Sequence, residues 1–106
     1  MHVLLDESLP RQLAREIAGH EVRTVRQAGW TGKKNGELLL LASVQFDAFP
    51  TADQNLEFQQ ELSKYQLLIL VLVAQSNRLV DLKPLVPKIQ VALENVKSGH
   101  LVRITA

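Results

Sequence analysis

The stretch Leu67-Leu68-Ile69-Leu70-Val71-Leu72-Val73 is continuously apolar and rich in branched side chains. A strand with one solvated face alternates apolar and polar residues, so an unbroken apolar run indicates a strand that is buried on both faces. Strands of that kind belong mostly to parallel sheets whose two faces are covered by helices. We therefore expect this stretch to be an inner strand of a parallel sheet.

Upstream of this stretch, strand patterns alternate with helical patterns. The expected strands are 2–5, 21–25 and 46–49, and Pro50 ends the third. The expected helices are 9–17, 37–44 and 56–62, with Ser8 as a candidate N-cap of the first. Residues 29–36 are rich in glycine and polar side chains, which favours a loop.

Downstream, apolar residues recur at helical spacing and predict a last helix over residues 82–96, with a fresh start at Pro84. Gly99 ends it, and a final strand is expected at 101–104. Strands and helices thus alternate along the whole chain. This order predicts a three-layer α/β/α sandwich with a mostly parallel sheet of about five strands and right-handed crossovers.

Length and composition favour one ordinary globular domain over residues 1–106. Hydrophobic residues make up 46% and charged residues 22% of the chain, which is typical of such domains. The net charge is only +1, so nucleic-acid binding requires a local basic patch. The chain has no cysteine, which excludes disulfides and cysteine-ligated zinc. We expect no signal peptide, because the N-terminus enters a strand pattern at once. We expect no membrane partner, because the longest apolar run, residues 67–74, is far shorter than the roughly 20 residues of a membrane span. The absence of cysteine is compatible with a cytoplasmic location, which we expect.

Two acidic residues follow expected strands. Asp6 comes directly after strand 2–5, and Asp53 comes shortly after the third strand. The carboxyl ends of parallel strands meet at one edge of the sheet, so these carboxylates are expected to converge. Converging carboxylates repel each other unless a cation lies between them, and a divalent cation held this way can cleave phosphodiesters. Two alternatives stay open: a solvated acidic turn at Asp6, and an N-cap of the next helix at Asp53.

Other polar residues are candidates for the same site. Glu37 either supplies a third carboxylate or simply places favourable charge at a helix start. The cations of Lys33-Lys34-Asn35-Gly36 either hold a phosphate or form a solvated loop. Arg78 follows strand 67–73 and is either a phosphate ligand or an ordinary surface arginine. The remaining candidates near the third strand are Gln54 and Asn55.

Several stretches match one family in the expected order. They are LLDESLP at 4–10, GWTGKKNGELL at 29–39, FD at 46–47 with TADQNL at 51–56, SNRL at 76–79 and LKPLVP at 82–87. They cover nearly the whole chain, and the Asp-Glu-x-Leu-Pro start combined with Thr-x-Asp is fairly specific. In these stretches the chain resembles the PIN-like proteins, small prokaryotic relatives of PIN-domain ribonucleases.

The resemblance implies a PIN-like α/β/α fold with an acidic pocket for Mg²⁺ or Mn²⁺. It also implies RNA cleavage, often as the toxin half of a toxin–antitoxin pair with an antitoxin partner. Carried over by position, Asp6 and Asp53 match the strand-end acids and Glu37 matches the helix-start acid. This chain departs from the pattern at Asn35 and Asn55, where many PIN-like chains carry acids. Each change removes a negative charge and should weaken metal affinity.

Two functions follow as hypotheses. The first is a metal-dependent ribonuclease in which Asp6, Glu37 and Asp53 hold the metal. Its substrate-binding residues are then Lys34, Asn35, Gln54, Asn55 and Arg78. The second is a non-catalytic PIN-like interaction module, which Asn35 and Asn55 favour. A homodimer formed through the apolar stripe of the last helix is a further expectation, although the core explains that stripe equally well. A phospho-acceptor domain needs a lysine after the last strand, where residues 101–106 have none.

Overall fold

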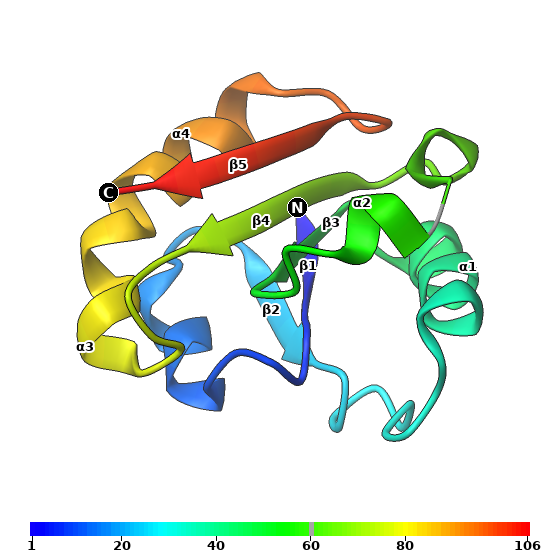
Figure 1. Ribbon diagram of the computed structural model, residues 1–106, viewed down its shortest axis with the longest axis horizontal. Helices are drawn as coiled ribbons and strands as arrows, with labels where there is room; N and C mark the ends of the chain where they lie inside the picture. Colours follow the sequence, from blue (N-terminus) through cyan, green and yellow to red (C-terminus); the bar gives the residue numbers. More distant parts are fainter. Residues whose placement is uncertain (60) are drawn as a thin grey trace.

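The computed structural model describes residues 1–59 and 61–106 and contains a five-stranded, all-parallel sheet (Figure 1). The strands are β1 (His2–Leu5), β2 (Glu21–Thr24), β3 (Ala48–Thr51), β4 (Leu68–Val73) and β5 (Leu101–Thr105). They lie in the order β2-β1-β3-β4-β5. The prediction of a compact α/β fold with a parallel sheet is confirmed.

Helical segments connect consecutive strands. They are the 3₁₀ helix η1 (Arg11–Glu16), α1 (Asn35–Gln45), α2 (Leu56–Gln59), the 3₁₀ helix η2 (Leu62–Lys64), α3 (Leu79–Leu82), the 3₁₀ helix η3 (Lys83–Leu85) and α4 (Val86–Asn95). None of the helices in the described residues is long and apolar enough to cross a membrane.

Strand β4 confirms the prediction made from its sequence. Residues 68–72 are buried, and the strand pairs with β3 on one side and with β5 on the other. The register places Ala48 beside Leu68 and Thr51 beside Val71. A strand paired along both edges and covered on both faces must be apolar throughout, which explains its unbroken apolar run.

Two clusters of buried side chains pack against the sheet, and adjacent residues of β1 divide between them. Val3 and Leu5 belong to the first cluster and Leu4 to the second, because successive strand residues point to opposite faces. The helical members of the first cluster include Leu13, Leu82, Leu85, Ile89 and Leu93. Those of the second include Leu38, Leu39, Ala42 and Leu56. The apolar stripe of α4 therefore faces the chain's own core.

The third strand lies two residues later than expected. Pro50 was expected to end it, but β3 covers Ala48–Thr51 and Pro50 pairs with Leu70 of β4. The carbonyl of Pro50 accepts a hydrogen bond from the backbone N–H of Asp6 (3.1 Å). The β1–β3 ladder has a single paired position, Val3 with Ala48, so a missing N–H on this side breaks no regular pairing.

Other boundaries also differ from expectation. The segment expected as a helix over 9–17 is a short 3₁₀ helix whose N-cap residue, Pro10, has no side-chain cap. Ser8 does not cap it, because its hydroxyl is bonded elsewhere, as described below.

Helix α1 begins at Asn35, inside the expected loop. The helix expected over 56–62 contains residue 60, which lies outside the described residues, and α2 ends at Gln59. The last helix is divided into α3, η3 and α4, with prolines near the starts of η3 and α4.

The strand order reverses its direction between β1 and β3. The chain leaves β1 toward β2 on one side, whereas it leaves β3 toward β4 on the other side. Ligands in open parallel sheets bind outside the carboxyl ends of strands at such a reversal. The residues that directly follow Leu5 and Thr51 therefore occupy the position where a ligand site is expected.

Candidate functional site

The carboxylate of Asp6 is anchored at the junction of β1 and β3. Its Oδ2 accepts hydrogen bonds from Ser8 Oγ and from Thr51 Oγ1, each at 2.7 Å. Ser8 Oγ in turn accepts from the backbone N–H of Ala52 (3.0 Å). Thr51 is fully buried and Asp6 is half-buried. The arrangement orients the carboxylate and leaves its Oδ1 outside the network.

Asp53 is connected to the same network through one hydroxyl. Its backbone N–H donates to Thr51 Oγ1 (3.0 Å), and its own Oδ1 accepts from the backbone N–H of Asn55 (2.9 Å). The structure thus brings Asp6 and Asp53 to the same junction, as expected for the ends of neighbouring parallel strands. The Asp53 carboxylate also stabilises the turn that precedes α2, and this bond leaves its second oxygen unused.

The donor set at this junction suits a hard divalent cation. Asp6 and Asp53 each keep one carboxylate oxygen outside the hydrogen bonds described above. Mg²⁺ is usually bound by one or two carboxylates and several waters, without a complete protein cage. Among the described residues, no three His, Cys, Asp or Glu side chains form a metal-ligand group. The candidate set is therefore these two carboxylates.

The third predicted acid makes a different contact. Glu37 lies in the first turn of α1, is exposed, and forms an ion pair with Lys33 (3.0 Å). Lys34 is the exposed N-cap residue of the same helix, and Asn35 donates through Nδ2 to Gln59 Oε1 (3.4 Å). Within the described residues, no hydrogen bond or ion pair joins these side chains to Asp6 or Asp53.

Gln54 and Asn55 lie in the turn between β3 and α2, and both are exposed. The carbonyl of Asn55 accepts from the backbone N–H groups of Phe58 and Gln59 at the start of α2. The backbone of Asn55 thus opens this short helix. The turn places both side chains immediately after Asp53, at the solvent side of the junction.

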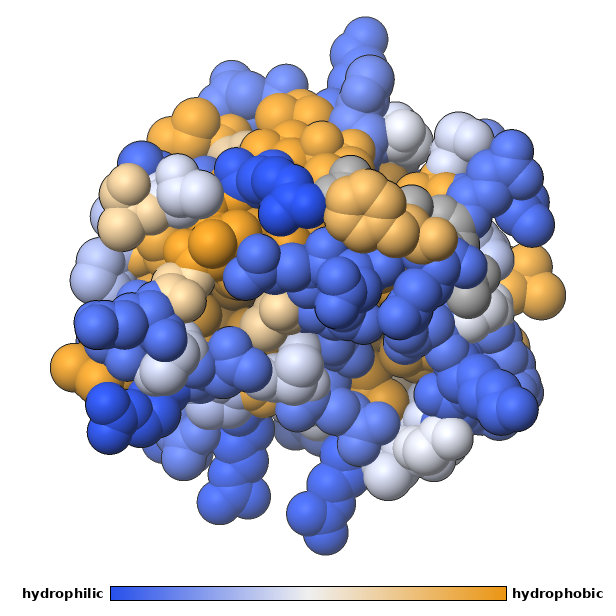
Figure 2. Space-filling model, viewed as in Figure 1, coloured by the Kyte–Doolittle hydropathy of each residue, from blue (hydrophilic) through white to orange (hydrophobic). Residues whose placement is uncertain are grey.

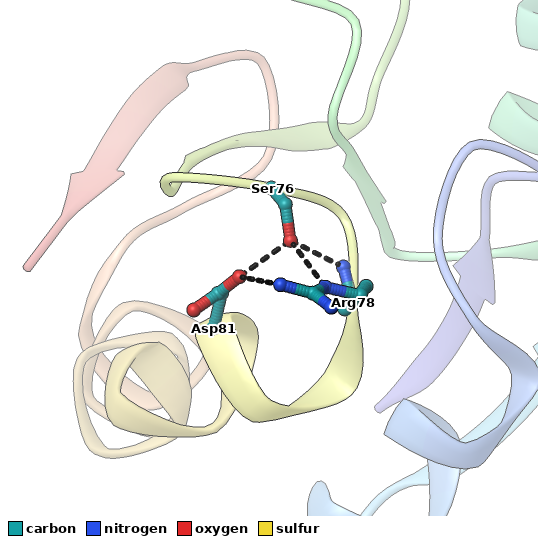
Figure 3. Close-up of polar contacts among 3 residues, drawn as sticks. All are labelled: Ser76, Arg78 and Asp81. Carbon is teal, nitrogen blue, oxygen red and sulfur yellow. Dashed lines mark hydrogen bonds and ion pairs between the residues drawn. The ribbon is translucent and has the colours of Figure 1, made fainter.

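Arg78 belongs to a separate cluster beyond the end of β4 (Figure 3). Its backbone N–H and its Nε both donate to Ser76 Oγ (3.1 and 3.4 Å), and Nη2 lies 4.0 Å from Asp81 Oδ2. Ser76 Oγ donates to the same carboxylate oxygen of Asp81. Arg78 does follow β4 as expected, but its guanidinium points into this cluster and stabilises the entry to α3.

Trp30 packs against the core of the fold. Its ring meets that of Phe46 edge-to-face, with centroids 5.8 Å apart. It is half-buried against the cluster that contains Leu38 and Leu39. The loop after β2 is therefore fastened to the core through this tryptophan.

A cavity of about 560 Å³ opens beside the anchored carboxylate. It is lined by Asp6, Glu7, Leu9, Arg11, Thr24, Val25, Arg26 and Gln27. The two arginines were not among the predicted site residues, because their position depends on how η1 and the turn after β2 pack together. Their signal in the sequence is the concentration of arginine between residues 11 and 26 in a chain of nearly zero net charge.

Comparison of the chain with protein-family models, with curated proteins and with solved structures gives no match.

Proposed function

We propose that the protein is a metal-dependent ribonuclease of PIN-like type whose active site is the β1–β3 junction. The observation that carries the proposal is the buried hydroxyl of Thr51, which donates to the carboxylate of Asp6 and accepts from the backbone N–H of Asp53, so that both acidic residues lie at this junction. The proposal includes a three-layer PIN-like arrangement of the helices around the sheet. It also includes a role as the toxin half of a toxin–antitoxin pair.

In this proposal, Asp6 and Asp53 hold Mg²⁺ or Mn²⁺ through their remaining carboxylate oxygens. Such a cation, when bound, supplies Lewis-acid stabilisation of charge on a phosphate. Ser8 and Thr51 hold the Asp6 carboxylate in a fixed orientation. Its free oxygen is therefore already oriented, and binding of the cation costs little further side-chain entropy. Gln54 and Asn55 are exposed beside Asp53 and are available for hydrogen bonds to RNA.

A non-catalytic PIN-like interaction module is the second candidate. Asn35 and Asn55 favour it, because each replaces an acid that many PIN-like chains carry and so removes a negative charge that would strengthen cation binding. The ion pair between Glu37 and Lys33 also favours the interaction module, because the carboxylate of Glu37, the third predicted metal ligand, is bonded to a cation of the chain itself. Binding of Mg²⁺ or Mn²⁺ separates the two candidates, because only the nuclease needs it.

The test is digestion of RNA by the purified protein with and without Mn²⁺, using Asp53→Asn and a matched control. Asn keeps an oxygen that can accept from Asn55 N–H, so the variant should stay folded. Asp47→Asn makes the same change at the opposite end of β3, where Asp47 is exposed and accepts from His2 N–H. We expect Asp53→Asn to lose more than the roughly 10–100-fold typical of outer-shell changes, and Asp47→Asn to retain activity. Undiminished cleavage by Asp53→Asn would overturn the assignment.

A further inference from the structure

Half of the cations of this chain are concentrated in one segment. Six of the twelve Lys and Arg residues lie between positions 11 and 34. They are Arg11, Arg15, Arg23, Arg26, Lys33 and Lys34. Hydrophilic side chains dominate the lower part of the view in Figure 2, over η1 and the segment after β2. The same segment contains only two acids, Glu16 and Glu21, so it has a local excess of positive charge although the net charge of the chain is only +1.

Two adjacent cavities lie in this segment. The cavity beside Asp6 contains Arg11 and Arg26, and a second cavity of about 470 Å³ contains Arg11 and Arg15. The two share Arg11, Thr24 and Gln27 in their linings, so they adjoin, and together they are called the depression. Acids line only the end at Asp6 and Glu7, whereas the far end contains arginines without an acid.

Two residues that line both cavities, Thr24 and Gln27, are hydrogen-bonded to each other. Thr24 N–H donates to Gln27 Oε1 (2.9 Å), and Gln27 N–H donates to Thr24 Oγ1 (3.1 Å). The backbone N–H of Gly32 donates to Glu7 Oε1 (3.4 Å), which fastens the following loop to the rim. The depression is thus built before any ligand binds.

The arginines of the depression have no partner among the described residues. The neighbouring acids bond other groups: Glu16 pairs with Lys83 (3.7 Å) and Glu21 with His2 (2.9 Å). Glu7, four residues before Arg11, accepts from the backbone N–H of Gly32 (3.4 Å). The side chains of Arg11, Arg15 and Arg26 make no ion pair or hydrogen bond within the part of the chain that the structure describes. Their guanidinium groups are exposed and free to bind a planar anion through two hydrogen bonds.

We infer that Arg11, Arg15 and Arg26 form a groove that binds the phosphate backbone of single-stranded RNA and leads it to Asp6. The inference rests on the proposed function for the choice of RNA. The change of charge along the groove supports this inference. Arginines at the far end would neutralise backbone phosphates, and carboxylates at the other end would hold the cation that meets the scissile phosphate. In this inference the arginines that bind the substrate are those of the groove. Arg78 is not one of them, because its guanidinium points toward Asp81.

The test measures binding of fluorescein-labelled oligouridylate of about 12 nucleotides by anisotropy, in EDTA, across a range of salt concentrations. EDTA removes any need for metal or cleavage. The variant is Arg11→Gln/Arg26→Gln, and the matched control is Lys64→Gln/Lys97→Gln. The control removes the same charge from exposed residues that line neither cavity. Arg11→Lys/Arg26→Lys restores the charge and keeps the result interpretable if the first variant folds poorly.

We expect the arginine variant to bind at least about tenfold more weakly at low salt than wild type. Its plot of log affinity against log salt should be shallower by about 1.4, because each lost phosphate contact removes about 0.7. The lysine control should stay within about twofold of wild type, and Arg11→Lys/Arg26→Lys should recover most of the slope. Equal losses in the arginine variant and the control would overturn the groove, as would absence of binding by wild type.

Two further outcomes separate this inference from its alternatives. Displacement of the oligonucleotide by polyglutamate at an equal concentration of charges would show an acidic-protein surface and overturn the choice of RNA. If wild type shows the expected binding pattern but no Mn²⁺-dependent cleavage, the nuclease proposal is overturned and the groove is kept. If wild type cleaves RNA but the arginine variant binds RNA as wild type does, the groove is overturned and the nuclease proposal is kept.

Discussion

Thr51 is the residue on which the candidate site depends. Its hydroxyl donates to the carboxylate of Asp6 and accepts from the backbone N–H of Asp53, so one atom connects two strand ends. It is fully buried, so water cannot replace either bond. A buried polar group keeps its place only when its hydrogen bonds are made, which is why this position holds a threonine within an apolar strand.

Replacement of Thr51 by valine tests this dependence. Valine keeps the shape but removes both hydrogen bonds, leaving Asp53 N–H without its partner and Asp6 Oδ2 with one donor fewer. We expect Thr51→Val to lower the free energy of unfolding by about 1–3 kcal/mol in urea denaturation. Thr105→Val, the same change at the exposed end of β5, should alter it by less than about 0.5 kcal/mol. Equal effects of the two substitutions would contradict the role given to Thr51.

The positions of Asp6 and Asp53 could be predicted from the sequence because each lies close to the end of a strand. The position of a strand end depends on local pattern, and the edge at which it lies depends only on parallel pairing. The arginines of the groove could not be predicted in this way. Arg11 and Arg26 belong to different connections, and only the packing of η1 beside β2 brings them to one cavity.

Helix α1 shows how burial divides neighbouring leucines. Leu39 is fully buried in the second core cluster, whereas Leu40 is 60% exposed. We expect Leu39→Ala to cost about 2–5 kcal/mol of unfolding free energy because it leaves a cavity in a packed core. Leu40→Ala removes the same atoms from the surface and should change stability by less than about 0.5 kcal/mol. Urea denaturation of the two variants checks this, and a large loss for Leu40→Ala would contradict the orientation of the helix.

The loop between β2 and α1 requires a left-handed residue at Gly32, where φ is +82°. Asn tolerates this conformation, whereas a β-branched residue does not. Gly32→Val should therefore be less stable than Gly32→Asn by about 1 kcal/mol or more in thermal or urea unfolding. Two variants of equal stability would mean that the loop adopts another conformation in solution.

Errors in the predicted elements have definite physical causes. Pro50 is expected to end the strand, yet it lies within β3 because the regular pairing with β1, at Val3 and Ala48, does not need its missing N–H, while its carbonyl still accepts from Asp6 N–H. The Leu9-Leu13-Ile17 pattern predicts a helix, but the short connection from β1 to β2 forms a 3₁₀ helix. Long apolar patterns such as β4 were predictable, since burial determines their composition. Short connections depend on tertiary packing, which the sequence alone does not display.

The whole chain is expected to unfold as one cooperative unit. The sheet is shared by both core clusters, so neither cluster can open without exposing the apolar strand β4. Trp30 fluorescence reports on the second cluster, whereas far-UV circular dichroism reports on all helices and strands. We expect the two urea transitions to coincide. A fluorescence transition at clearly lower urea would show that the cluster of α1 unfolds separately.

The most direct test of the central claim is a titration with Mn²⁺ followed by electron paramagnetic resonance, because it needs no knowledge of the RNA substrate. The claim is that Asp6 and Asp53 hold a divalent cation at the junction of β1 and β3. We predict saturable binding by wild type and by Asp47→Asn, and binding weakened at least about tenfold in Asp6→Asn. No binding by wild type at millimolar Mn²⁺, or equal binding by wild type and Asp6→Asn, would contradict the claim.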